Sequence, residues 1–287
     1  MKLPDILSFP DVKQRIRDAL AEDLGPGKLD ATSFALVPAG ETAEAHLVAR
    51  QDGILSGGPV AAEVFRQVDG CLEIVEKKKD GSAVKPGDVV LSIIGSARAM
   101  LVAERTALNF IQRMTGIATL TRRYVEEAGN PDVLILDTRK TTPTLRTFEK
   151  YAVVCGGGTN HRYGLFDRVL IKDNHLAHWT REGGDLAGSI HVTREKYPHL
   201  LVEVEVDTIQ QLKSVLPAKP DWVLLDNMPP SELRECVKLC AGICKTEASG
   251  GVNLKTIREI ARTGVDAISV GALTHSAPSS DLALDFV

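Results

Sequence analysis

The stretches Leu201-Val-Glu-Val-Glu-Val-Asp207 and Trp222-Val-Leu-Leu-Asp-Asn227 decide the fold class of this chain. Each is a short valine- or leucine-rich run that ends in acidic or amide side chains, a pattern typical of a buried strand followed by a turn. A helical stretch at Ser231–Leu239 follows the second run. Strands that alternate with helices predict parallel strands joined by crossover helices, so we expect an α/β fold.

The same alternation continues in both directions along the chain. A helical stretch is expected at Leu254–Thr263. We therefore expect a C-terminal β/α barrel, whether closed, open or incomplete, over residues 114–275. The remaining predicted strands are Val133–Leu136, Val169–Ile171, Ile243–Lys245 and Ala267–Val270.

Residues 1–113 have a different pattern of apolar and turn-forming residues. Helical periodicity at Pro10–Leu24 precedes short β-like runs separated by Gly, Pro and Asp turn signals, which predicts antiparallel strands. We expect an N-terminal α+β, sandwich-like domain on which the C-terminal tail, 276–287, packs. A helix with an interruption at Gly116 is expected over Ala99–Leu120. The predicted strands are Ala43–Ala49, Leu72–Val75 and Val89–Ile94.

Composition excludes several classes of protein. The 287 residues are 44% hydrophobic and 25% charged, an ordinary globular mixture rather than that of a disordered chain. The net charge of −4 argues against a general nucleic-acid binder. No apolar run reaches membrane-spanning length, and Met1–Asp5 lacks the layout of a signal peptide. The odd number of cysteines, five, suits a reducing compartment. We expect a cytoplasmic protein with no nucleic-acid or membrane partner.

Polar side chains follow the predicted strands at the point where each strand ends. Because the carboxyl ends of parallel strands meet at one face, and β/α barrels place their active sites there, these groups predict a site. The groups are Asp137–Lys140, Lys172–His175, Glu203–Asp207, Asp226–Asn227, Glu247–Gly251 and Gly271.

Cations dominate the candidate site. Positive charges that converge in one place are costly unless an anionic ligand neutralises them, so we expect a ligand with several negative charges. Arginine suits carboxylate and phosphate geometry, whereas lysine acts as a point charge. The candidates are Arg105, Arg139, Lys140, Arg162 and Lys172, with His161 beside them.

Acidic residues form a second group. Glu203 and Glu205 are two apart on a predicted strand, so their side chains face the same side of it. With Asp226 they could hold Mg²⁺ or the hydroxyls of a sugar, or they could only balance the basic cluster as an internal ion-pair network. Ser249-Gly250-Gly251 and Gly271-Ala272 precede predicted helices, where backbone N–H groups favour phosphate; ordinary turns explain each pair equally well.

Four sequence blocks together resemble the quinolinate phosphoribosyltransferase family, and the resemblance extends over essentially the whole chain. Thr144 departs from the family pattern, which often has Gly after Thr-Thr-Pro; a residue with a Cβ atom restricts that turn. The blocks are Thr138-Arg-Lys-Thr-Thr-Pro-Thr-Leu-Arg146, Glu149-Lys-Tyr-Ala-Val153, Gly156-Gly-Gly-Thr-Asn-His-Arg162 and Leu170-Ile-Lys-Asp-Asn-His175.

The resemblance implies transfer of a phosphoribosyl group from phosphoribosyl pyrophosphate to quinolinate with loss of CO₂, giving nicotinate mononucleotide for NAD synthesis. It implies that Arg105, Thr138, Arg139, Lys140, His161, Arg162 and Lys172 bind quinolinate. It implies that Glu203, Glu205, Asp226, Ser249, Gly250, Gly251, Gly271 and Ala272 bind the phosphoribosyl group. Lys140, Lys172, Glu205 and Asp226 are the expected catalytic residues, and Glu205 and Asp226 the expected Mg²⁺ ligands.

The family also implies a homodimer with shared active sites, or a hexamer of such dimers, in which Arg105 reaches the site of a neighbouring subunit. Other functions stay open at this point. A nicotinate phosphoribosyltransferase, the related paralogue linked to molybdate transport, and an anion-binding module without catalysis all fit a cationic pocket. Cys236, Cys240 and Cys244 share a helical spacing, but the spacing matches no common zinc pattern and favours buried thiols.

Overall fold

The computed structural model describes residues 3–27 and 29–287, and the chain divides into two compact units. The first unit comprises Met1–Arg122, Thr141–Gly157 and Leu273–Val287, and the second comprises Arg123–Lys140 and Gly158–Ala272. The second unit therefore interrupts the first twice along the chain.

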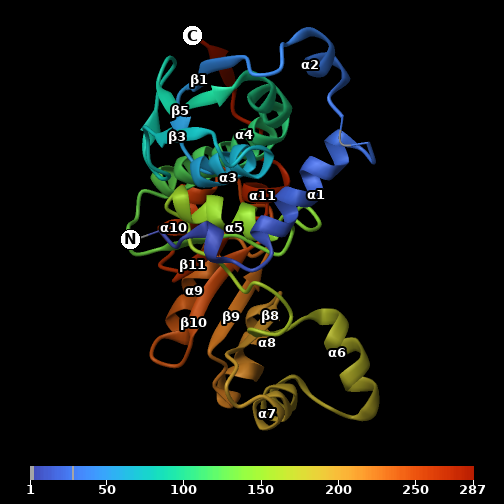
Figure 1. Cartoon of the computed structure of the whole chain (residues 1–287). Helices are drawn as coiled ribbons and strands as arrows, with labels where there is room; N and C mark the ends of the chain where they lie inside the picture. The colour runs from blue at the N-terminus through green and yellow to red at the C-terminus, as the bar shows by residue number, and fades with distance from the viewer. Residues whose placement is uncertain (1–2, 28) are drawn as a thin grey trace. The chain divides into compact units, whose positions relative to one another are not determined.

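The first unit contains an antiparallel sheet with strand order β12-β1-β5-β3 (Figure 1). The C-terminal tail supplies β12, which pairs with β1 from Ala45↔Phe286 to Ala49↔Leu282. An α+β architecture is thus confirmed for this part. The strands are β1 (Thr42–Ala49), β2 (Gly53–Ile54), β3 (Glu73–Glu76), β4 (Ala83–Val84), β5 (Val89–Ser96) and β12 (Leu282–Phe286); the helices are η1 (Ile6–Ser8), α1 (Val12–Leu24), α2 (Ala31–Leu36), α3 (Gly58–Val68) and α5 (Arg146–Cys155).

The long helix α4 (Ala97–Ala128) runs without a break through Gly116, so the predicted interruption is wrong. The glycine serves a close approach instead. A Cβ atom at Gly116 would lie 2.0 Å from the carbonyl oxygen of Pro278, which belongs to the C-terminal tail. The predicted domain boundary after residue 113 lies inside this helix, whereas the two units separate after Arg122.

The second unit is built on a parallel sheet with strand order β6-β11-β10-β9-β8-β7, in which β8, β9 and β10 lie side by side (Figure 1). Within the described ranges β6 and β7 each pair with one strand, so the barrel is open. The strands are β6 (Leu134–Leu136), β7 (Val169–Ile171), β8 (Val202–Val206), β9 (Trp222–Asp226), β10 (Lys245–Ser249) and β11 (Ala267–Ser269); the helices are α6 (Asp173–Trp179), η2 (Thr180–Glu182), α7 (Leu186–Lys196), α8 (Ile209–Val215), η3 (Leu216–Ala218), α9 (Pro230–Cys240), α10 (Ile257–Ala261) and α11 (Ala272–His275).

Two predicted elements differ from the observed ones. The strand expected at Ile243–Lys245 begins at Lys245, because the N–H of Ile243 donates to the carbonyl of Cys240 (2.9 Å) and keeps that segment in the turn after α9. The helix expected at Leu254–Thr263 is the shorter α10, because Asn253 and Thr256 bond to each other in a turn. None of the helices in the described part of the chain is both long and apolar enough to cross a membrane.

Candidate active site

The register of the parallel sheet brings inward-facing side chains together at one end of the second unit. Glu205 on β8 pairs with Leu224 on β9, which pairs in turn with Glu247 on β10, and Asp226 pairs with Ser249. Side chains two residues apart on a strand face the same side. A cavity of about 430 Å³ results. Its walls are Thr138, Arg139, Lys140, His161, Arg162, Leu170, Lys172, Glu205, Leu224, Asp226, Glu247, Ser249 and Ser269.

Cations converge in this cavity as the sequence predicts. Arg139, Lys140, Arg162 and Lys172 all line it. Burial and the positive charge of Arg139 lower the pKa of Arg162, as expected for two guanidinium groups that line the same cavity. An anion between them would offset this repulsion, so this part of the cavity suits a negatively charged ligand.

The edge of β6 positions His161 and Arg162. Thr159 forms a parallel bridge with Leu136, and its N–H donates to the carbonyl of Ile135 (2.8 Å). The buried carboxylate of Asp137 then accepts from the N–H of His161 (2.9 Å). These bonds fix residues 159–162 against the end of the strand and direct the two side chains into the cavity.

Lys172 follows β7 and forms an ion pair with Glu205 on the neighbouring strand β8. The N–H of Lys172 donates to Nδ1 of His175 (3.0 Å), which lies in the first turn of α6. The Lys-x-x-His spacing in this block therefore fixes the backbone of the lysine. His175 does not line the cavity.

Below the cations lies a buried cluster of three titratable groups. Nε2 of His161 is 3.1 Å from Oε2 of Glu203 and 3.2 Å from Oε2 of Glu247. Glu203 also pairs with Arg168 (3.3 Å) and does not line the cavity. Burial alone would lower the pKa of His161, but the two carboxylates raise it to about 9. The N–H of Arg162 donates to Nδ1 of the same ring (2.7 Å), so both ring nitrogens of His161 lie beside protein groups.

Sequence reasoning placed Glu247 among the polar groups at the strand ends but assigned it no role in the site. The signal that could have found it is alternation, because Glu247 and Ser249 are two residues apart on a strand. Placing that strand at Ile243–Lys245 hid the relation. The corrected bounds of β10 put both side chains on the cavity side.

Of the five residues predicted to form phosphate-binding loops, one lines the cavity. Ser249 lines the cavity, whereas Gly250, Gly251, Gly271 and Ala272 do not. Gly250 adopts φ +91°, and a Cβ atom there would lie 2.1 Å from Oδ1 of Asn227, so this position requires glycine. Helix α10 begins six positions after Gly251, three residues later than the helix predicted from Leu254.

Arg105 is exposed on α4 in the first unit, whereas every residue that lines the cavity belongs to the second unit. The Thr-Thr-Pro and Glu-Lys-Tyr stretches, within residues 141–157, also lie in the first unit, where Thr142, Glu149 and Tyr151 have structural roles. The buried Glu149 accepts from Arg113 (2.9 Å) and from the N–H and hydroxyl of Thr142 (3.0 and 2.8 Å), and Tyr151 donates to Asp80 (2.9 Å).

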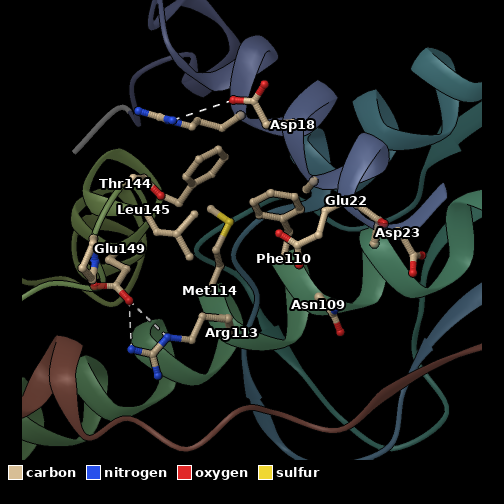
Figure 2. A pocket seen from close by; sticks show the side chains of 15 residues that line it. Asp18, Glu22, Asp23, Asn109, Phe110, Arg113, Met114, Thr144, Leu145 and Glu149 are labelled. Atoms are coloured by element: carbon tan, nitrogen blue, oxygen red, sulfur yellow. Dashed lines mark hydrogen bonds and ion pairs between the residues drawn. The ribbon is translucent and has the colours of Figure 1, made fainter. Parts of the chain in front are cut away.

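Figure 2 shows a different cavity, of about 470 Å³, between α1, α4 and the loop that precedes α5 in the first unit. Asp18, Glu22 and Asp23 line it beside the apolar Phe110 and Met114. These carboxylates would repel an anionic ligand, so this cavity does not match the ligand class that the sequence predicts. Thr144 at its edge has φ +69°, a left-handed conformation that strains a β-branched residue.

Family models match both the N-terminal and the C-terminal part of the chain. The family model for the N-terminal domain of quinolinate phosphoribosyl transferase matches residues 30–115, and the model for the C-terminal domain matches residues 117–285. The chain is 40% identical over 275 residues to a probable carboxylating nicotinate-nucleotide pyrophosphorylase of Bacillus subtilis, covering 96% of this chain and 93% of that protein.

The Mycobacterium leprae protein named carboxylating nicotinate-nucleotide pyrophosphorylase is 41% identical over 282 residues, which cover 96% of this chain and 98% of the relative. Among solved structures, the nicotinate-nucleotide pyrophosphorylase from Francisella tularensis superimposes with a TM-score of 0.90 at 36% identity, over the whole of both chains. These similarities extend over both compact units.

Proposed function

Because the chain belongs to the quinolinate phosphoribosyl transferase family, we propose that it transfers a phosphoribosyl group from phosphoribosyl pyrophosphate to quinolinate, with release of pyrophosphate and CO₂. The product is nicotinate mononucleotide, a precursor of NAD. The observation that carries this proposal is the cavity at the carboxyl ends of the parallel strands, where four cations converge.

Quinolinate is a pyridine with two adjacent carboxylates, which suits this arrangement of charges. Arg139 and Arg162 would each bind a carboxylate through paired N–H donors, and Lys140 and Lys172 would add point charges. Thr138, His161 and, from outside the cavity wall, Arg105 complete the proposed quinolinate set. A ligand with two carboxylates would offset the repulsion between Arg139 and Arg162.

The acidic wall would bind the sugar and its metal. Glu205 and Asp226 present carboxylates from the adjacent strands β8 and β9 to the cavity, and oxygen donors of this kind fit Mg²⁺. Bound Mg²⁺ would neutralise charge on the pyrophosphate leaving group. Ser249 and the loop glycines Gly250, Gly251 and Gly271 with Ala272 would hold the 5′-phosphate, and the buried Glu203 would support Glu205 two residues away.

In the proposed transfer the ring nitrogen of quinolinate attacks the anomeric carbon of the ribose as the bond to pyrophosphate breaks. Positive charge develops on the sugar, where the carboxylates of Glu205 and Asp226 stabilise it. Lys140 and Lys172 stabilise the negative charges of both substrates. The pyridinium that forms then loses its 2-carboxylate as CO₂; the electron pair of the broken bond stays on C2, where the adjacent cationic nitrogen stabilises it until C2 takes up a proton.

The exposed position of Arg105 on α4 supports a further part of the proposal, an active site shared between subunits of a homodimer. Each arginine would enter the cavity of the neighbouring subunit. Mixing Arg105→Ala chains with Lys172→Ala chains tests this arrangement. Mixed dimers should regain activity, since one of their two sites is intact, and strict inactivity of the mixture would contradict sharing.

The test of the reaction is detection of nicotinate mononucleotide by mass spectrometry after incubation with quinolinate, phosphoribosyl pyrophosphate and Mg²⁺. Nicotinate in place of quinolinate is the matched control, because it lacks the 2-carboxylate that the cations would bind. We expect product from quinolinate and little from nicotinate. Equal product from both would favour a nicotinate phosphoribosyltransferase, and binding of phthalate without pyrophosphate release would favour an anion-binding module.

A further inference from the structure

Glu247 lines the cavity but has no role in the phosphoribosyl transfer proposed for the other residues. Glu247 is fully buried from solvent yet lines the cavity. Its carboxyl oxygens contact Nε2 of His161 (3.2 Å) and the side chain of Ser269, and neither of these groups is a permanent cation. An ionised carboxylate in such a place is costly, whereas a protonated carboxyl group is tolerated.

The charges around Glu247 favour the protonated form. Its nearest charged or titratable neighbours are Nε2 of His161 at 3.2 Å and, on the other side of that ring, Glu203. Glu203 has a permanent cation, Arg168, at 3.3 Å, whereas the recorded partners of Glu247 among the described residues are the imidazole of His161 and the side chain of Ser269. Of two carboxylates this close, the one without its own cation takes up the proton.

The imidazole of His161 directs a proton toward the two carboxyl groups. The N–H of Arg162 donates to Nδ1 of His161 (2.7 Å), and a backbone N–H cannot accept a proton in return. The ring therefore carries its proton on Nε2, toward the carboxyl groups. The two carboxylates raise the pKa of His161, and burial and the charge of Glu203 raise the pKa of Glu247, so both groups hold protons more tightly in this cluster.

The hydrogen bond from the N–H of Arg162 to Nδ1 of His161 also argues against a metal ion bound by the cluster. His161, Glu203 and Glu247 each offer one ligand atom within 4.8 Å of the others. A metal would need an unprotonated Nε2, and metal-bound histidines donate a proton from their other ring nitrogen. Here that other nitrogen is an acceptor. The cluster is therefore arranged to hold a proton.

We infer that Glu247 is the general acid of the decarboxylation step, donating the proton that replaces the departing carboxyl group at C2 of the pyridine ring. This inference rests on the proposed function. When the bond between C2 and the carboxylate breaks, CO₂ leaves and the electron pair stays on C2, next to the cationic nitrogen. C2 then takes the proton of Glu247, and the resulting carboxylate regains a proton from water, so each turnover consumes one proton.

The lysines that line the cavity are less suited to this step. Lys172 is paired with Glu205, and a lysine that gives up its proton loses the charge that holds a substrate carboxylate. Glu247 instead gains a negative charge at the moment when the negative carboxylate of the substrate leaves as neutral CO₂. The balance of charge in the cavity is therefore preserved.

The test compares wild-type protein with Glu247→Gln, which keeps the shape of the side chain and removes the acid. Pyrophosphate release and CO₂ release are measured separately, and nucleotide products are identified by mass. We expect pyrophosphate release to stay within about threefold of wild type while decarboxylation slows by about 100-fold or more. Quinolinate mononucleotide, which retains both carboxylates, should then accumulate.

One CO₂ for each pyrophosphate at the wild-type rate in Glu247→Gln, with no dicarboxylated nucleotide, would overturn the inference. Absence of pyrophosphate release in wild type would instead refute the proposed function, so the two failures are distinguishable. Glu259→Gln, at an exposed position on α10, is the matched control and should behave as wild type.

If Glu247→Gln does not fold, the wild-type protein still tests the inference. Rapid-quench measurements at increasing pH, up to the highest pH at which the protein stays folded, should show a growing fraction of dicarboxylated nucleotide as the acid loses its proton. A constant fraction over this range would overturn the inference.

Discussion

Lys172 and Glu205 form an ion pair at the cavity, so in the absence of ligand a cation proposed to bind quinolinate is held by a carboxylate proposed to bind the sugar. The two residues come from neighbouring strands, and each charge reduces the availability of the other. Substrates that bind to them must therefore replace this pair. The pair couples the two halves of the proposed site.

Glu205→Gln should separate these two roles. The variant releases Lys172 from its carboxylate, so we expect binding of phthalate, an unreactive dicarboxylate, to tighten by about threefold. The turnover number should fall by about tenfold or more, because the sugar loses a stabilising charge in the transition state. Calorimetric binding and steady-state kinetics measure the two effects. Weaker phthalate binding in this variant would contradict the coupling.

Arg139→Ala should weaken the proposed carboxylate binding. Loss of a paired guanidinium–carboxylate contact is expected to lower kcat/KM for quinolinate by about 10- to 100-fold. Arg139→Lys should recover only part of it, since lysine lacks the planar pair of donors. Arg234→Ala, at an exposed position on α9, is the control. Near-normal kinetics in Arg139→Ala would remove this arginine from the site.

Glu247 should also affect the pH dependence of stability. Burial and then the charge of Glu203, against the contact with His161, raise the pKa of Glu247 above its ordinary value of 4.5. The folded state then binds this proton more tightly than the unfolded state, so the contribution to stability is complete below pH 4.5 and declines as pH rises toward the raised pKa. Thermal melting of Glu247→Gln against wild type should show the variant gaining relative stability as pH rises. A difference in melting temperature that does not change with pH would contradict the raised pKa.

Gly250→Ala should destabilise the loop after β10. The residue has φ +91° and its added Cβ atom would meet Asn227, so we expect a loss of about 2 kcal/mol or more in unfolding free energy. Gly251→Ala is the matched control, because it has φ +60° and open space around it, and it should lose about 1 kcal/mol. Chemical denaturation measures both. Equal losses would mean that contact with Asn227 has no effect.

Thr144→Gly should stabilise the protein slightly. The left-handed conformation at φ +69° strains threonine by about 1–2 kcal/mol, and the greater freedom of glycine in the unfolded chain offsets about half of this. We expect a gain of about 0.5–1 kcal/mol with unchanged quinolinate kinetics. Lys219→Gly, at φ +50° without β-branching, is the comparison and should gain less. Loss of stability in Thr144→Gly would show that the threonine side chain makes a compensating contact.

Local pattern determined much of the fold. Valine-rich runs such as Val202–Val206 bury both faces of a parallel strand, and their short length and acidic ends are visible in the amino-acid order. The helix across Gly116 and the start of β10 at Lys245 were mispredicted, because a glycine and a short apolar run have the same local appearance in several structures. The approach of Pro278 and the turn at Cys240 decide these two cases, and both are contacts rather than patterns.

The sequence by itself determined which residues are chemically suited to the site, because charge and strand-end position are local properties. Arg139, Lys140, Arg162 and Lys172 could all be named from it. Only the tertiary structure decided that Glu247 shares the imidazole of His161 with Glu203, since the register of β8, β9 and β10 sets which side chains meet. The proton that this cluster holds depends on distances between groups far apart in the chain, and folding alone fixes those distances.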